Sequence, residues 1–168
     1  MTTSNEKMLE EFRAFTNDER AMVQAAALMF EPFQTTQMVD VLQKFFKRNL
    51  DNVAIRDTQK KLVKKGFLTV KGHHYRGDKK FSNYLLDTEF RQNDDYTELA
   101  VVIQKVLASM YWYGSTGDLG QRAMRDVRIA YYSGNYTAFV GQFLSSHWFA
   151  QQKIQPRVRS RIFHARAF

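Results

Sequence analysis

The clearest structural signals of the sequence lie in residues 52–86, NVAIRDTQKKLVKKGFLTVKGHHYRGDKKFSNYLL. In the first part of this stretch, Ile55, Thr58 and Leu62 recur at the spacing of one helix face. Gly66 follows one turn later, where the end of a helix favours a residue with left-handed backbone geometry. The pattern therefore predicts a helix that begins near residue 52 and stops at this glycine.

The second part of the stretch indicates a β-hairpin. Residues 67–70 are mostly apolar or β-branched, as in strands, whereas residues 73–78 read as a turn. Residues 81–86 then predict a returning strand. We expect the two strands to pair.

Two helices are predicted near the N-terminus. Residues 5–15 place apolar side chains at helical spacing. Thr16 and Glu19 fit a capping box that opens a second helix, which runs to about residue 30. Pro32 disfavours helical geometry in the residue before it and so ends that helix.

One more helix is predicted directly before residues 52–86. We expect it to run from a cap at Thr35 or Thr36 to about residue 46, and Asp51 or Asn52 to cap the helix that follows. From there the predicted order is helix, strand, turn and strand.

Leu62, three further residues and then Gly66-Phe67-Leu68 resemble the end of the recognition helix in winged-helix proteins such as the MarR-like and ArsR-like regulators. In those proteins a leucine packs inward, a glycine stops the helix and an apolar pair starts the first wing strand. The resemblance covers roughly residues 17–90 and is one of pattern, with no subfamily assigned. It implies a winged helix-turn-helix, mainly α with a small β-hairpin, followed by an α-helical subdomain.

Four regions are expected along the chain. They are an N-terminal helix over 1–16, the winged-helix domain over 17–92, a helical subdomain over 93–150, and a basic tail, or the start of a further region, over 151–168. The third region carries a stripe of apolar residues at helical spacing that begins at Leu99.

The net charge of +8 is concentrated in one segment. Residues 44–80 hold twelve basic and three acidic side chains, whereas residues 1–43 hold three basic and seven acidic ones. A concentrated positive segment favours a polyanionic partner. The alternative is that these charges form an ordinary solvated face.

The predicted helix over 52–65 arranges its cations in a row. At about 100° per residue, Arg56, Lys60 and Lys64 lie away from the core side, with Lys61 nearby. Lysines mostly contact phosphates, whereas Arg56 and Gln59 are suited to base edges. We expect this row to face the major groove of double-stranded DNA.

The hairpin adds a second basic cluster, expected to reach the adjacent DNA backbone or minor groove. Adjacent histidines at 73 and 74 on a strand would point to opposite faces, so no metal site is expected. The candidate nucleic-acid-binding residues are Arg56, Gln59, Lys60, Lys61, Lys64, Lys71, His74, Arg76, Lys79 and Lys80, with His73 beside them.

Several classes of function are not favoured by the sequence. The absence of cysteine excludes disulfides and thiolate catalysis, and no histidine or glycine pattern matches a metal or phosphate site. We expect no enzyme, no cofactor and no membrane span, and a cytoplasmic location, nucleoid-associated if the source is bacterial.

Three functions stay open at this point. The first is a DNA-binding winged-helix protein whose C-terminal helices dimerise or dock. The second is a protein-interaction winged helix, kleisin-like or an adaptor domain, in a larger DNA-handling complex. The third is a single-strand or RNA-binding module that stacks bases on aromatic side chains such as those at 111–113 and 148–149.

Overall fold

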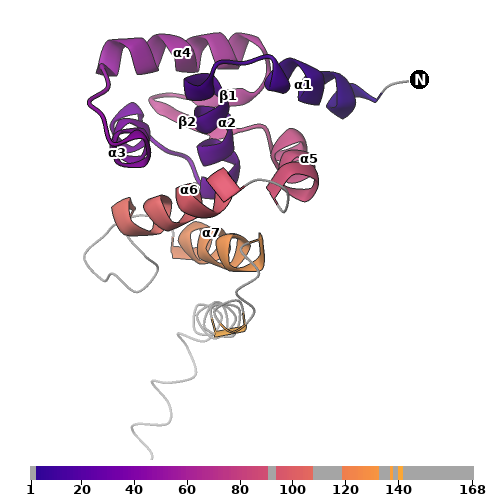
Figure 1. Ribbon diagram of the computed structural model, residues 1–168, viewed down its shortest axis with the longest axis vertical. Coiled ribbons are helices and arrows are strands. Elements are labelled where there is room, and N and C mark those ends of the chain that lie inside the picture. The colour runs from indigo at the N-terminus through magenta and orange to yellow at the C-terminus, as the bar shows by residue number, and fades with distance from the viewer. Residues whose placement is uncertain (1–2, 91–93, 108–118, 133–136, 138–139, 142–168) are drawn as a thin grey trace, which may run out of the picture.

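The computed structural model describes residues 3–90, 94–107, 119–132, 137 and 140–141. Within these residues the protein is mainly helical, with a small two-stranded antiparallel sheet (Figure 1), which confirms the predicted fold class at this coarser level. The elements are α1 (Ser4–Arg13), α2 (Asn17–Met29), α3 (Thr35–Phe46), α4 (Asn52–Lys64), β1 (Leu68–Lys71), β2 (His74–Gly77), α5 (Lys79–Glu89), α6 (Asp94–Val106) and α7 (Leu119–Tyr132).

The capping box predicted at the start of α2 is confirmed. The Glu19 amide donates to the Thr16 hydroxyl at 3.3 Å, and the Thr16 amide donates to the Glu19 carboxylate at 3.0 Å. This exchange satisfies two amide donors that the first turn of a helix leaves free. The helix ends at Phe30, whose φ of 58° places it in the left-handed region, two residues before Pro32.

The cap predicted for α3 is wrong by one residue. The N-cap is Gln34, and its backbone amide donates to the side chain of Gln37 at 2.8 Å. Thr35 is already helical, and its hydroxyl donates across to Gln59 of α4 at 2.8 Å. The Thr35 hydroxyl therefore joins α3 to α4 and does not cap α3 as the sequence pattern had predicted.

The hairpin is shorter than predicted and lies earlier in the chain. Residues 73–78 were expected to form a turn, but β2 (His74–Gly77) occupies most of them and pairs with β1 from Leu68↔Gly77 to Lys71↔His74. The turn itself is Gly72-His73, with Gly72 at a φ of 60°. Such a turn needs a positive φ, which glycine adopts without strain.

The returning strand predicted over residues 81–86 is also wrong, because α5 covers this segment. The Asp78 side chain accepts a hydrogen bond from the Phe81 amide at 2.8 Å and so caps the helix. Phe81, Leu85 and Leu86 are all buried, and their spacing suits one face of a helix. The Asp78 cap and the apolar helix face thus favour a helix over residues 81–86, although the local residue types suggested a strand.

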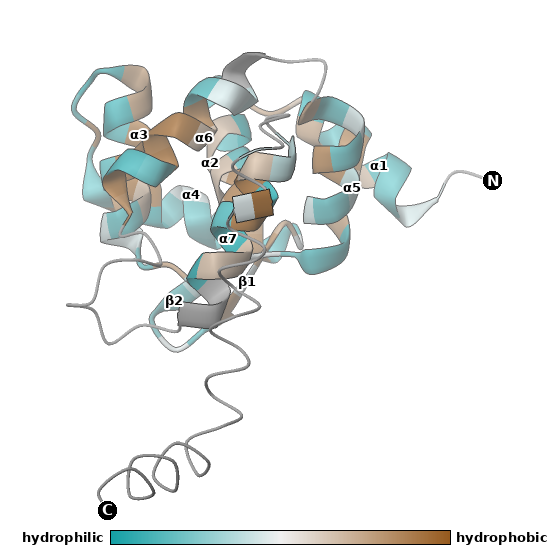
Figure 2. Ribbon diagram, turned by 90° about the horizontal axis from the view of Figure 1, so that it is seen from below, coloured by the Kyte–Doolittle hydropathy of each residue, from teal (hydrophilic) through white to brown (hydrophobic). Residues whose placement is uncertain are grey.

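The helix α2 lies in the middle of the described structure, and residues 21–29 are all buried. In Figure 1, α4 crosses one end of the molecule, whereas α7 lies towards the opposite end beyond α6. Figure 2 shows apolar segments of α3 and α6 next to each other. The hydrophobic core includes residues from Leu9 of α1 to Ile129 of α7. The arrangement leaves the outer face of α4 uncovered by the other described elements.

Some features of the sequence lie outside the described residues. They are the aromatic groups at 111–113 and 148–149, most of the glycine-containing loop at 114–120 and the basic segment at 151–168. Among the helices that the structure does describe, none combines the length and apolar character needed to cross a membrane.

Candidate nucleic-acid interface

Local sequence signals at both ends fix the position of α4. The Asp51 carboxylate accepts hydrogen bonds from the amides of Val53 (3.1 Å) and Ala54 (3.2 Å), which confirms one of the two predicted caps. At the other end, Gly66 has a φ of 82°, and the Phe67 amide donates to the Leu62 carbonyl at 3.0 Å. The glycine thus ends the helix in the left-handed geometry predicted for it.

The outer surface of α4 carries the predicted row of cations. Arg56, Lys60 and Lys64 are all exposed. Lys60 is 3.1 Å from the Asp57 carboxylate, a pair between two exposed side chains. Within the part of the chain that the structure describes, Arg56 and Lys64 have no carboxylate partner. Their positive charge is therefore available to an external anion.

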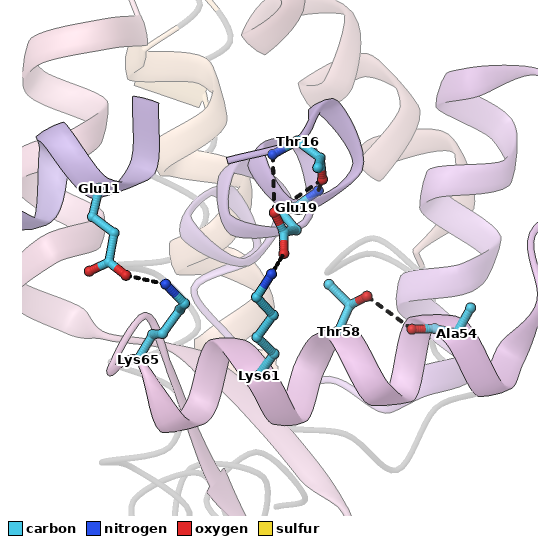
Figure 3. Close-up of polar contacts among 7 residues, drawn as sticks. All are labelled: Glu11, Thr16, Glu19, Ala54, Thr58, Lys61 and Lys65. Atoms are coloured by element: carbon cyan, nitrogen blue, oxygen red, sulfur yellow. Dashed lines mark hydrogen bonds and ion pairs between the residues drawn. The ribbon is translucent and has the colours of Figure 1, made fainter. Parts of the chain in front are cut away.

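Lys61 of α4 and Lys65, the residue that caps the C-terminus of this helix, turn instead towards the N-terminal helices (Figure 3). The Lys61 ammonium lies 2.5 Å from the Glu19 carboxylate of α2, and Lys65 forms an ion pair with Glu11 of α1. Only 10% of the Glu19 side chain is exposed, against 55% for Lys61. Lys61 was expected to contact nucleic acid; in the structure its ammonium helps to attach α4 to α2.

The environment of Glu19 sets its ionisation. Burial raises the pKa of this carboxylate, but hydrogen bonds from Lys61 and Thr16 together lower it by more, and the net result is a lowered pKa. Glu19 is therefore ionised at neutral pH and holds Lys61 by charge as well as by hydrogen bonding. Sequence reasoning missed Glu11 and Glu19 as partners of α4, although the acidic balance of residues 1–43 was a signal for them.

Gln59 was expected to reach base edges, and the structure places it in the interior. It is fully buried between α3 and α4, where its side-chain oxygen accepts the hydrogen bond from Thr35. The buried face of α4 consists of Ile55, Gln59 and Leu62. Thr58, which the sequence pattern placed on this face, is only half-buried. Gln59 was assigned by its polarity, whereas its helical position lies between two core residues. It does not belong to the outer surface.

The expected basic cluster of the hairpin is divided between three places. Lys71 and His74 are exposed and face each other in register at the end of the hairpin, and His73 is exposed in the turn. Arg76 lies over the ring of Phe30, with its guanidinium carbon 5.0 Å from the ring centroid. Lys79 and Lys80 are exposed in the first turn of α5, outside the hairpin. Lys71, His73 and His74 thus form the exposed basic part of the hairpin.

Two arginines of α7 are used inside the protein. Arg125 is 1% exposed and forms ion pairs with Glu31 at 2.5 Å and with Asp126 at 3.0 Å. Burial raises the pKa of Glu31, and the neighbouring Arg125 lowers it in part. Arg128 stacks on Phe30, with its guanidinium carbon 4.4 Å from the ring centroid.

Among the described residues, no group of three or more histidines, aspartates or glutamates is placed to hold a metal ion.

Comparison with protein-family models, with curated proteins and with solved structures finds no match to this chain.

Proposed function

We propose that this protein binds double-stranded DNA, with the outer surface of α4 facing the major groove and the β1–β2 hairpin beside it as a short wing. The observation that carries the proposal is the exposed row of Arg56, Lys60 and Lys64 at one end of the molecule. A helix of this diameter fits the major groove, and its cations then lie near both base edges and phosphates.

The order of elements supports a winged-helix interpretation. Helices α2, α3 and α4 precede the hairpin, as in the family that the sequence resembles. Phe33, between α2 and α3, forms a β-bridge with Tyr75 of β2, through backbone hydrogen bonds of 2.9 and 2.8 Å. This bridge ties the hairpin to the helices that hold α4. Helix and hairpin can therefore approach one DNA duplex as a unit.

The cations have different roles in this proposal. Arg56 presents a planar guanidinium that can donate two hydrogen bonds to guanine, whereas Lys60 and Lys64 contact phosphates. Lys71 and His74 at the end of the hairpin contact the neighbouring backbone. Lys61 stays with Glu19 and supplies no DNA contact.

A pair of matched double variants tests the proposal. R56A/K64A removes the two cations of α4 that have no described carboxylate partner, and K7A/K105A removes the same charge from exposed positions on α1 and α6. Binding to a fluorescent 24-base-pair duplex is measured from low to moderate salt. Each lost phosphate contact flattens the slope of log affinity against log salt by about one unit. We expect a flattening of about one unit for R56A/K64A, from the lost Lys64 phosphate contact, with a further loss of affinity at all salt concentrations from the lost Arg56 base contact, and little change for K7A/K105A.

Equal behaviour of the two double variants would refute the assignment to α4. Failure of the unmodified protein to bind the duplex at low salt would refute DNA binding as a whole. Circular dichroism and urea unfolding of each variant exclude misfolding as the cause.

A second function is favoured by two exposed apolar side chains, one on α4 and one on the hairpin. Val53 in the first turn of α4 is 62% exposed, and Val70 of β1 is 49% exposed. Exposed valines beside cations suit a protein partner with an acidic and apolar face, as in the interaction module of a larger DNA-handling complex. Mass measurement of the protein alone and with captured partners separates this function from the first. If the protein binds a protein partner through these valines, V53S/V70S abolishes the capture of that partner and leaves the salt dependence of DNA binding unchanged.

A further inference from the structure

A cavity of about 520 Å³ lies between α1, α2, α3, α5 and α6, on the side of α2 away from α4. Glu19 points from α2 towards α4, whereas Asn17, Ala21 and Gln24 line the cavity. At about 100° per residue these three lie on the opposite face of the helix. The volume is within the range of small-molecule sites in proteins, which is roughly 300–1,000 Å³.

The side chain of Gln24 is the most informative feature of the cavity. Only 6% of this residue is exposed, and it makes no side-chain hydrogen bond within the described part of the chain. A buried amide normally finds partners, because an unpaired one costs roughly 1–3 kcal/mol. Its polar atoms are not sealed off, so the cavity is the space into which the amide can donate and accept hydrogen bonds.

Arg20, one turn before Gln24, supplies an uncompensated charge. Its guanidinium donates to the Asn17 side chain at 2.5 Å and has no carboxylate partner among the described residues. The other cations of the cavity are compensated: Arg13 pairs with Glu89 at 2.6 Å, and Lys47 lies 3.8 Å from Glu98. The cavity therefore has one unmatched positive charge, next to the free amide of Gln24.

Aromatic side chains form the apolar part of the lining. Phe12 is 3% exposed, and Phe45 and Phe46 are half-buried with ring centroids 5.0 Å apart. Together with Ala21 they offer a surface on which a flat apolar group can rest. Charge, amide and rings thus occur together in one cavity.

We propose that this cavity binds a small organic anion in which a carboxylate is attached to an aromatic ring. The carboxylate accepts a bidentate pair of hydrogen bonds from Arg20 and a further one from the Gln24 amide. The ring lies against Phe45 and Phe46. A cationic ligand is not favoured, because Glu89 already accepts two hydrogen bonds from Arg13 and Glu98 is more than half exposed beside Lys47.

The test uses 1-naphthoate as the probe and compares it with two matched compounds by titration calorimetry. The neutral 1-naphthamide keeps the ring and removes the charge, and acetate keeps the carboxylate and removes the ring. We expect saturable one-to-one binding of 1-naphthoate. The affinity of 1-naphthamide is at least about tenfold weaker because it lacks the charge-assisted hydrogen bonds, and that of acetate is at least about tenfold weaker because it buries no ring.

Two arginine variants locate the site. R20Q removes the charge from the cavity, and R56Q makes the same change on the outer surface of α4. We expect R20Q to weaken 1-naphthoate binding at least about tenfold and R56Q to leave it unchanged. Q24L, which keeps the size of the side chain, weakens binding while the protein remains folded by circular dichroism.

Several results would overturn the proposal: no saturable binding of 1-naphthoate up to about 10 mM, equal affinity for 1-naphthoate and 1-naphthamide, or equal losses in R20Q and R56Q. None of these outcomes depends on whether the protein binds DNA.

Discussion

Replacing Glu19 by glutamine tests whether the acidic N-terminal helices hold α4 in place. The Glu19 carboxylate accepts hydrogen bonds from the Thr16 amide at 3.0 Å, the Thr16 hydroxyl at 3.1 Å and the Lys61 ammonium at 2.5 Å. Glutamine can keep the contacts with Thr16 through its oxygen. Its amino group then faces Lys61, which loses both a charge and an acceptor.

The structure sets the size of the expected effect. A hydrogen bond to a charged group contributes about 1.5–3 kcal/mol to stability when it is buried. Lys61 is more than half exposed, so solvent screens part of this contribution, and we expect E19Q to lose about 1–2 kcal/mol. The matched control is E11Q, because the Glu11–Lys65 pair also joins the end of α4 to an N-terminal helix, but its carboxylate is more accessible, 42% exposed against 10% for Glu19. We expect E11Q to lose less than about 1 kcal/mol.

Urea unfolding followed by circular dichroism measures both values, provided that the slopes of the transitions agree. The pH dependence gives an independent check. The pKa of Glu19 is lower in the folded than in the unfolded protein, so its ionisation stabilises the fold above the unfolded value of about 4.3. This stabilisation is lost as the pH falls through the folded pKa, and the difference between E19Q and the unmodified protein then closes. Equal losses in E19Q and E11Q, or a difference that persists in acid, would refute the reasoning.

Three further substitutions test other parts of the structure. G77A places a Cβ atom 2.7 Å from the Ser82 hydroxyl and 3.1 Å from a backbone oxygen of α2, so we expect a loss of about 1–3 kcal/mol in urea unfolding and partial recovery in G77A/S82A. Q59M removes a buried side-chain nitrogen that has no hydrogen-bond partner, but also the oxygen that accepts from the Thr35 hydroxyl, so we expect a loss of about 1 kcal/mol in stability and a constant DNA affinity; weaker DNA binding would contradict the interior position of Gln59. D57N releases Lys60 from its ion pair, and we expect tighter DNA binding at low salt with a slope steeper by up to about one unit; an unchanged affinity and slope would place Lys60 outside the interface.

Short-range signals in the sequence predicted most helix boundaries correctly. The Thr16–Glu19 capping box, the Asp51 cap and Gly66 all act within a few residues of the helix end that they define, so their geometry follows from local spacing alone. The segment at 81–86 was misinterpreted although a signal of the same kind was present. Asp78 stands three residues before Phe81, which is the spacing of an N-cap.

The site was less predictable, because it depends on contacts between distant residues. The row of Arg56, Lys60 and Lys64 was predicted from helical geometry, and the structure leaves these side chains exposed. By contrast, Lys61 and Gln59 are engaged by residues of α2 and α3 that lie 42 and 24 positions away in the sequence. Periodicity assigns a residue to a face of its own helix, but it does not identify the element that covers that face.

The ion pairs in the structure limit the number of cations that can contact DNA phosphates, and the net charge alone does not give this limit. Five of the twelve basic residues in 44–80 form ion pairs in the structure, three of them with acids of α1 and α2. If all twelve contacted phosphates, the slope of log affinity against log salt would approach about −11, at about −0.9 for each contact. Four of the five pairs join the segment to other helices, and the eight remaining cations, Lys60 included, limit the slope to about −7. A measured slope steeper than about −7 would require the internal pairs to break on binding, and E19Q would then steepen it no further. A slope of about −7 or shallower is the result expected if these four pairs stay intact on binding, with the acidic helices keeping Lys61 and Lys65 out of the interface.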